Sequence, residues 1–245
     1  MSSFTLSRRT MLGGAVALPV LAVAGKCLAE TWEEQWNREI KADFSMQNRY
    51  RADNERILAA HEKVDIVFMG DSITQGWKDL HPSFFKPGRV GRGIGGQTTP
   101  QMLVRMMSDV VDLKPRAVHI MAGTNDIAGN TGPMTQEMTR DNFRAMTAIA
   151  QHHKIKVILA SIPPAASFPW RPGMETVKPI RELNEWLKDY AASIGAAYVD
   201  YHPTLADAHG GMRPGLANDG VHPTVAGYEA MERVIEPVLK RVLGK

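Results

Sequence analysis

Two short stretches of the chain place a serine, an aspartate and a histidine where they could act together on an ester or amide bond. Ser72 follows an apolar segment in "VDIVFMGDSITQGW" (64–77), and Asp219 and His222 lie three residues apart in "NDGVHPTVAGY" (218–228). A serine hydroxyl is a weak nucleophile unless a base is oriented beside it, and an imidazole held by a carboxylate supplies that base. Each residue alone also has an ordinary explanation, because a serine after a strand commonly caps the next helix.

A glycine-rich stretch and an asparagine could complete such a site. The segment "GRGIGGQTTPQM" (91–102) puts Gly96 at a turn before a helical pattern, and "GTND" (123–126) supplies the side-chain amide of Asn125. Acyl transfer requires hydrogen-bond donors for the negatively charged oxygen of its intermediate, and accessible backbone N–H groups and amides fill that role. Taken separately, both residues are ordinary turn residues. Together with the serine, the aspartate and the histidine they make a full set of roles.

These residues need a scaffold that brings them together, and the apolar pattern predicts one. Apolar strands alternate with segments of helical periodicity, which implies parallel strands joined by crossover helices in a three-layer α/β/α sandwich. We expect strands over 65–69, 117–122, 156–161 and 197–200, a further short strand near 89–91, and helices over 100–111, 136–153, 177–194 and 224–243. Ligands bind beyond the carboxyl ends of the strands in such sheets, where the serine and the asparagine stand.

The N-terminal segment has the composition of an export signal. Arg8 and Arg9 precede a short apolar run rich in glycine and alanine, and Ala29 ends a small-residue cleavage sequence. This segment resembles a twin-arginine signal. The apolar run is shorter than the roughly 20 residues that span a bilayer. Cys27 suggests a lipid anchor as an alternative, but Lys26 occupies the position at which lipoprotein signals have a small residue.

The chain therefore divides into three expected parts. Residues 1–29 form the export signal, residues 30–60 an N-terminal helical extension and residues 61–245 the hydrolase-like domain, in a periplasmic or extracellular protein. In the extension, four apolar side chains recur every four residues and predict a helix docked on the domain: Trp32, Trp36, Ile40 and Phe44.

Charge and motifs exclude several other classes of protein. The sequence has 29 basic and 26 acidic residues, and three of the basic ones lie in 1–29, so the mature chain is near neutral and predicts neither nucleic-acid binding nor stable membrane association. Gly91, Gly93 and Gly96 fit the dinucleotide-binding spacing, but no acidic residue ends a second strand about 20 positions later. The eight histidines contain no H-E-x-x-H, so no metal site is expected.

Four blocks in a fixed order resemble one known family. "GDSIT", "GIGG", "GTND" and "DGVHP", spread over Val64–Tyr228, are similar to the blocks of the SGNH hydrolases, or GDSL esterase/lipase family, and most similar to its secreted bacterial and platelet-activating-factor acetylhydrolase-like branch. The resemblance implies a doubly wound sheet of flavodoxin-like order 2-1-3-4-5. It also implies Ser72 as nucleophile, His222 as base and Asp219 as its orienting acid, with no metal or organic cofactor.

The resemblance further implies an oxyanion hole made of the Ser72 N–H, the Gly96 N–H and the Asn125 amide. We expect a serine esterase that releases short acyl groups, chiefly acetyl, through an acyl-enzyme, with a small-molecule or glycan ester as substrate. Trp77 and Trp170 are expected to border the cleft and to favour a sugar ring, with packing over the core as the alternative for each. The alternatives are a lysophospholipase, arylesterase or thioesterase of the same family, and a non-catalytic glycan-binding domain. The oligomeric state does not follow from the sequence.

Overall fold

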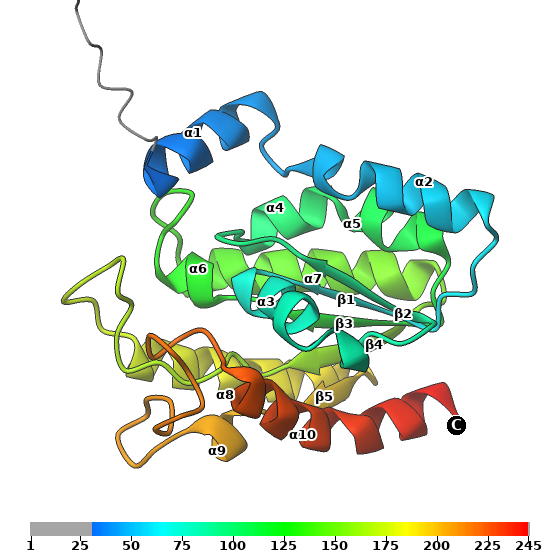
Figure 1. Cartoon of the computed structure of the whole chain (residues 1–245). Coiled ribbons are helices and arrows are strands. Elements are labelled where there is room, and N and C mark those ends of the chain that lie inside the picture. Colours follow the sequence, from blue (N-terminus) through cyan, green and yellow to red (C-terminus); the bar gives the residue numbers. More distant parts are fainter. Residues whose placement is uncertain (1–30, 245) are drawn as a thin grey trace, which may run out of the picture.

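A parallel sheet of five strands forms the centre of the protein in the computed structural model, which describes residues 31–244 (Figure 1). The strand order is β2-β1-β3-β4-β5, which confirms both the predicted α/β fold and the order 2-1-3-4-5. The expected export signal, residues 1–29, lies outside the described residues. The strands are β1 (Ile66–Gly70), β2 (Arg89–Gly93), β3 (Ala117–Met121), β4 (Lys156–Ala160) and β5 (Ala197–Val199).

Strands β1 and β3 are buried on both faces because helices cover the sheet on both sides. Every residue of β1 and of β3 is buried, and Ile66, Val67 and Phe68 are fully inaccessible to solvent. Such continuous apolar runs are typical of parallel strands, whose crossover helices shield both faces. The alternation read from the sequence thus locates each strand within one or two residues.

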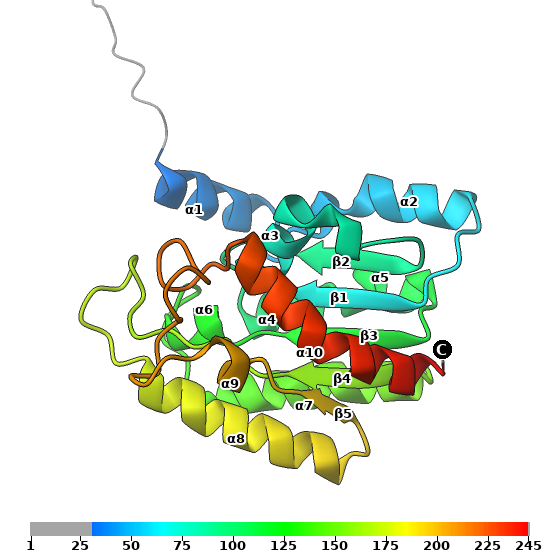
Figure 2. The same cartoon turned by 60° about the horizontal axis from the view of Figure 1, so that its bottom comes forward.

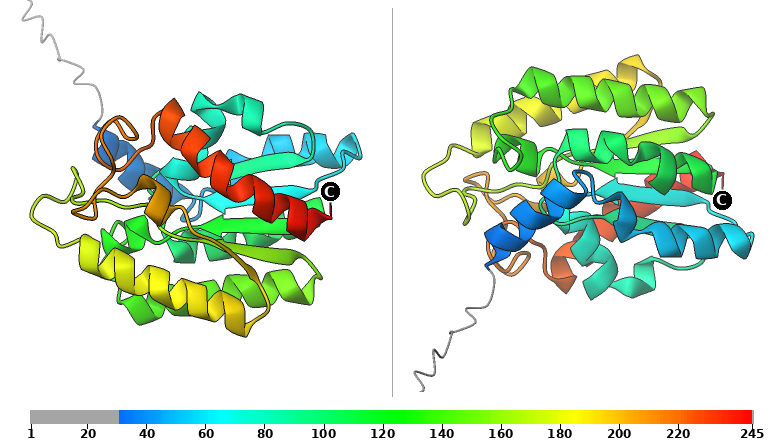
Figure 3. Two further views of the ribbon diagram at one scale, coloured as in Figure 1. Left: turned by 90° about the horizontal axis from the view of Figure 1, so that it is seen from below. Right: turned by 90° about the horizontal axis from the view of Figure 1, so that it is seen from above.

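Helices form the outer layers. Helices α3 and α10 cover one face and contact each other, and α4, α5 and α7 lie over the opposite face (Figures 2 and 3). Helix α8 packs along β4 and β5. The predicted helix over 100–111 is divided into two short helices. The helices of the α/β part are α3 (Ser72–Leu80), α4 (Thr99–Val104), α5 (Met106–Asp109), α6 (Thr124–Ile127), α7 (Gln136–His152), α8 (Val177–Ser193), α9 (His202–Leu205) and α10 (Val225–Leu243).

Two N-terminal helices, α1 (Trp32–Ala42) and α2 (Arg51–Ala59), run across the layer that contains α4 and α5 (Figure 3, right). A capping box between Thr31 and Glu34 starts α1. The expected docked stripe is present in part: Trp36 is buried, but Phe44 lies beyond the helix end and is 47% exposed. In residues 31–244, no helix is both long and apolar enough to cross a membrane.

The loops that follow the strands gather at one end of the sheet (Figure 2). The long proline-rich loop after β4 and the segment between α9 and α10 both lie at this end, beside α6 and the start of α3. Residues that are distant in sequence therefore meet at the carboxyl edge of the sheet, where open α/β folds place their ligands.

Candidate active site

Ser72, His222 and Asp219 form one chain of hydrogen bonds at the carboxyl edge of the sheet, although 150 positions separate the serine from the histidine. Ser72 Oγ lies 2.9 Å from His222 Nε2, and His222 Nδ1 lies 2.7 Å from Asp219 Oδ2. When Nδ1–H donates to the carboxylate, Nε2 is left as an acceptor facing the serine hydroxyl. This arrangement can take a proton from the serine oxygen.

The serine stands at the junction of β1 and α3 because the local sequence starts a helix there. The Asp71 carboxylate accepts the Ile73 N–H at 2.9 Å and caps α3, so Ser72 is the first residue of the helix. The helix N-terminus is partly positive and favours a developing negative charge nearby. Gly93 lets α3 approach the sheet closely, since a Cβ at this position would lie 2.2 Å from the Gln75 backbone nitrogen.

Asp219 is held by a tight turn that also positions the imidazole. Its Oδ1 accepts the backbone N–H of His222 at 2.8 Å and that of Val221 at 3.0 Å. Partial burial alone would raise the pKa of the Asp219 carboxyl, but the hydrogen bonds from His222 and Val221 outweigh burial and hold this pKa below its ordinary value. The carboxylate is therefore ionised at neutral pH, as an acceptor for the imidazole N–H must be.

A pocket of about 210 Å³ opens beside the serine, and Ser72, Gly96 and Asn125 all line it. Gly96 has a φ of +75°, in the left-handed region that favours glycine. Within the described part of the chain, the backbone N–H groups of Ser72 and Gly96 have no hydrogen-bond partner. Asn125 is buried, and its Nδ2 donates to Gln97 O at 3.0 Å, which leaves its second amide hydrogen for the pocket. All three donors belong to residues that line this pocket.

Asn130 is a lining residue that sequence reasoning missed. Its Nδ2 donates to Asn125 Oδ1 at 2.9 Å and to Gly96 O at 3.2 Å, and its Oδ1 accepts Trp170 Nε1–H at 3.2 Å. An asparagine between glycines in "AGNTG" is ordinary turn composition, so no signal in the sequence distinguishes it. Only the fold shows that one amide connects three walls of the pocket.

Trp170 lies at the pocket, as expected. It is half-buried, stacks on Phe168 with ring centroids 5.1 Å apart, and has its ring centroid 6.1 Å from that of His222. The proline-rich loop after β4 therefore supplies an aromatic wall beside the imidazole.

The expectation that Trp77 borders the cleft is wrong. Trp77 is fully buried and stacks between Phe84 and Tyr228, with ring centroids 4.6 Å and 5.8 Å away. Its Nε1 donates to Glu232 Oε1 at 3.0 Å. The helix turns by about 100° per residue, so a side chain five positions after Ser72 points about 140° away from it. Trp77 is a core residue between α3 and α10.

The described residues, 31–244, contain no group of three or more histidine, cysteine, aspartate or glutamate side chains that could hold a metal ion. The chemistry of this site is that of a hydroxyl, an imidazole, a carboxylate and three N–H donors. This set of groups is suited to acyl transfer.

Solved structures resemble this chain over most of its length. A Bacteroides fragilis protein described as an acylhydrolase is 41% identical with a TM-score of 0.78, and the match covers 82% of this chain and 99% of that one. A GDSL-like lipase of Bacteroides thetaiotaomicron is 40% identical with a TM-score of 0.76, covering 81% of this chain and 99% of the other.

Among curated proteins, the uncharacterized lipoprotein YqeF of Bacillus subtilis is 33% identical over 118 residues, which are 41% of this chain and 49% of that protein. The chain thus spans about half the length of this curated relative. The sequence model of the GDSL-like Lipase/Acylhydrolase family matches residues 68–230, from within β1 to within α10. The match includes the other four strands and every residue of the hydrogen-bonded chain. With this match and these structural relatives, the chain belongs to the GDSL-like lipase/acylhydrolase family of ester hydrolases.

Proposed function

We propose that the protein is a serine esterase that removes short acyl groups, chiefly acetyl, from carbohydrate esters. Ser72 is the nucleophile, His222 the general base and Asp219 the group that orients it. The main support for this proposal is a pair of contacts beside a pocket lined by N–H donors. Ser72 Oγ lies 2.9 Å from His222 Nε2, and His222 Nδ1 lies 2.7 Å from Asp219 Oδ2.

The reaction proceeds in two displacements. His222 Nε2 accepts the Ser72 proton as Oγ attacks the ester carbonyl carbon, and the carbonyl oxygen becomes an oxyanion that accepts hydrogen bonds from Ser72 N–H, Gly96 N–H and the Asn125 amide. The intermediate collapses, the bond to the alcohol oxygen breaks, and the imidazolium gives its proton to the alcohol. Water, deprotonated by His222, then attacks the acyl carbon and releases the acid and free Ser72. No step passes through a metal or an organic cofactor.

The size of the pocket favours a short acyl group. At about 210 Å³ the pocket beside Ser72 is below the roughly 300–1,000 Å³ that accommodates drug-sized ligands. Trp170 and the Asn125–Asn130 pair line this small volume. These walls suit an acetyl group better than a fatty acyl chain, and they favour an acetylesterase over a lysophospholipase.

The test is hydrolysis of p-nitrophenyl esters from acetate to palmitate by the wild type, Ser72→Ala and Asn125→Ala. We expect a preference for acetate, loss of turnover in Ser72→Ala by at least about 10³-fold, and loss in Asn125→Ala by about 10²–10³-fold. Ser193→Ala, an exposed serine on α8, is the matched control and should retain wild-type rates.

Each alternative predicts a different result. Equal hydrolysis by the wild type and Ser72→Ala would exclude Ser72 as nucleophile and favour the non-catalytic glycan-binding domain. A kcat/KM that rises beyond butyrate would instead favour a lipase or lysophospholipase. Thermal unfolding of each variant shows whether a lost rate reflects chemistry or folding.

We also propose that the protein is exported by its twin-arginine segment. The support is the sequence of residues 1–29 and the name of the Bacillus subtilis relative as a lipoprotein. Replacing Arg8 and Arg9 by lysine should retain the protein in the cytoplasm, measured by fractionation, and unchanged export would contradict the proposal.

A further inference from the structure

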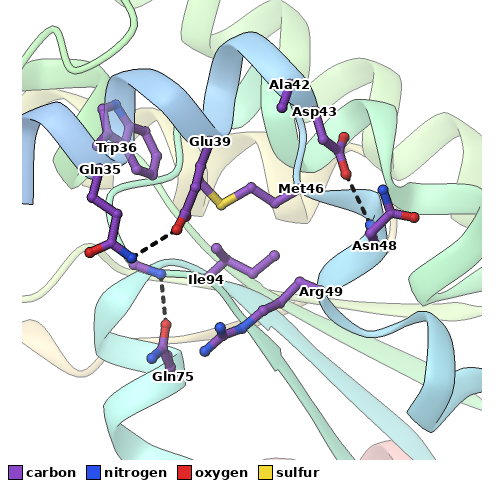
Figure 4. A pocket seen from close by; sticks show the side chains of 11 residues that line it. Gln35, Trp36, Glu39, Ala42, Asp43, Met46, Asn48, Arg49, Gln75 and Ile94 are labelled. Atoms are coloured by element: carbon purple, nitrogen blue, oxygen red, sulfur yellow. Dashed lines mark hydrogen bonds between the residues drawn. The ribbon is translucent and has the colours of Figure 1, made fainter.

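A second pocket, of about 560 Å³, adjoins the pocket at Ser72 and is larger. It lies between α1, the turn that follows α1, and the loop after β2 (Figure 4). Gly95 lines both pockets, and its N–H donates to Gln75 Oε1 at 2.8 Å. Gln75 stands one helical turn after Ser72 on α3. The two spaces are therefore neighbours across one glycine and one glutamine side chain.

This position gives the second pocket a role in the proposed reaction. When an ester carbonyl lies at Ser72, its acyl part fills the small pocket, and its alcohol part must extend out of that pocket. The second pocket shares Gly95 with the small one, so it borders the region into which that alcohol extends. A group larger than the acyl part has room there, because the second pocket has more than twice the volume of the first, about 560 Å³ against about 210 Å³.

Polar and apolar side chains share the walls of the second pocket, and the polar ones carry both signs of charge. Glu39 points into it from α1 and accepts a hydrogen bond from Gln35 Nε2 at 2.8 Å (Figure 4). The Arg49 side chain extends across it toward Gln75 (Figure 4). Within residues 31–244 the Arg49 guanidinium has no hydrogen-bond or ion-pair partner, so its donors are available to a ligand.

Apolar surface is present beside these polar groups. Met46 and Ile94 line the same pocket, and the buried Trp36 forms part of its wall. A fatty chain placed here would cover charged groups without giving them hydrogen bonds, which is unfavourable. A sugar unit instead offers hydroxyls to the amide, carboxylate and guanidinium groups and a C–H face to the apolar ones. The mixture of both charges also disfavours a polyanion.

We propose that the second pocket binds the sugar units next to the acetylated one, so that the natural substrate is an acetylated neutral oligosaccharide rather than an acetylated monosaccharide or a lipid. This inference rests on the proposed esterase function and adds to it a binding site for the alcohol part. Glu39 and Arg49 are the residues that distinguish an oligosaccharide from a small ester.

The test compares two substrates that share the acetyl ester. p-Nitrophenyl acetate needs only the small pocket, whereas acetylated xylotriose and acetylated mannotriose reach the second. Glu39→Ala and Arg49→Ala should each lower kcat/KM for at least one acetylated trisaccharide by about fivefold to tenfold, chiefly through KM, as expected for a lost hydrogen bond to a charged group. Both variants should hydrolyse p-nitrophenyl acetate within about twofold of wild type, since neither residue touches the Ser72 pocket.

Matched controls are Glu33→Ala on α1 and Arg51→Ala on α2, exposed residues of the same charge that do not line the pocket. Both should keep wild-type rates on every substrate. Calorimetric titration of the inactive Ser72→Ala protein with the same trisaccharides gives a readout independent of turnover, and the Glu39→Ala and Arg49→Ala exchanges made in that protein should weaken binding by the same factor.

Three results would overturn the inference. The first is unchanged trisaccharide kinetics in both variants, and the second is an equal fall on both substrates, which would show a general structural effect. The third is a wild type that hydrolyses p-nitrophenyl acetate but neither trisaccharide. In all three, Ser72-dependent hydrolysis of p-nitrophenyl acetate is retained, so the assignment of the protein as a serine esterase is not overturned with the inference.

Discussion

At the scale of single residues, Asn130 is the position whose role is least visible in the sequence and clearest in the structure. The Asn125 amide can stabilise an oxyanion only if its nitrogen, not its oxygen, faces the pocket. Asn130 Nδ2 donates to Asn125 Oδ1 at 2.9 Å, and Asn125 Nδ2 donates to Gln97 O at 3.0 Å, which fixes that orientation. Asn130 is therefore a positioning residue for the proposed oxyanion hole.

Replacing Asn130 should lower kcat while leaving KM for p-nitrophenyl acetate within about twofold. Asn130→Ala removes the donor that holds the Asn125 amide, and Asn130→Asp replaces it with an acceptor that repels Asn125 Oδ1, so Asn130→Asp should be the slower variant. We expect losses of about 10–100-fold, less than for removal of the Asn125 amide itself.

A double-mutant cycle separates positioning from a general effect on the fold. If Asn130 acts through Asn125, its replacement in the Asn125→Ala protein should change kcat little further, because the group it orients is absent. Additive losses in the double variant would show that Asn130 acts by another route. Thermal unfolding of all four proteins provides the folding control.

At the scale of elements, the junction of β1 and α3 carries a buried acid with a measurable effect on stability. Asp71 is almost fully buried and accepts one backbone hydrogen bond, from Ile73 N–H at 2.9 Å. Burial raises the pKa of the Asp71 carboxyl to about 6, against the lowering effects of that hydrogen bond and of His222. In the unfolded chain the same carboxyl has an ordinary aspartate pKa, about 3.9.

The sign of the pH effect follows from this difference. Between about pH 4 and pH 6 the folded protein holds a proton on Asp71 that the unfolded chain has released, so the contribution of this group to stability falls as pH rises through about 6. Asp71→Asn keeps the cap but never ionises. The variant should match the wild type near pH 4 and exceed it at pH 7 by about 2–3 kcal/mol in free energy of unfolding.

Urea unfolding from pH 4 to pH 8 measures this prediction. Asp189→Asn, an exposed aspartate on α8, is the control and should follow the wild-type profile. An Asp71→Asn protein that is less stable than the wild type at pH 7 would contradict this prediction. It would show that the ionised carboxylate stabilises the fold by capping α3 more than its burial destabilises the fold.

The elements were largely predictable, and the errors have physical causes. The strands and long helices follow the apolar pattern because both sheet faces are covered, so each run stands out from its polar boundaries. Helix α2 lacks such a pattern: only Asn54 and Ile57 of its residues are buried. Trp77 was misplaced because its distance along the chain from Ser72 was considered, whereas the turn of the helix decides where it points.

The site was predictable to the extent that the four family blocks contain it. Ser72, Gly96, Asn125 and His222 all line one pocket, as their blocks suggested. Asn130 and Gln75 are outside any chemical pattern, because each acts through a hydrogen bond to a partner that only the fold brings near. Such supporting residues depend on tertiary contacts, which a single sequence does not contain.

At the scale of the whole molecule, buried polar contacts join the N-terminal helices to the sheet. Arg92 of β2 is fully buried, donates to Asn54 Oδ1 through Nε at 3.0 Å, and forms an ion pair with Asp53 at 2.9 Å. Asn54 Nδ2 in turn donates to Asp109 Oδ1 at 2.7 Å, and Asp109 pairs with the buried Arg105. Helix α2 therefore supplies hydrogen-bond and ion-pair partners to Arg92 in β2 and a hydrogen-bond partner to Asp109 in α5. The second pocket depends on the same attachment, because Arg49 lies two residues before the start of α2.

Asn54→Ala should consequently destabilise the entire domain, not only the extension. The change removes one buried hydrogen-bond partner from Arg92 and one from Asp109, which keep their ion pairs with Asp53 and Arg105. We expect this loss to cost about 2–4 kcal/mol, whereas Glu55→Ala on the exposed side of α2 should leave the unfolding midpoint unchanged. For each of the two proteins, denaturant unfolding should give a single transition that coincides in far-UV and near-UV circular dichroism. Hydrogen exchange should likewise show the amides of α2 and β1 opening together. A variant of near wild-type stability, in which α2 exchanges long before the sheet, would mean that residues 30–60 are a separable extension and that the second pocket can open without unfolding the site at Ser72.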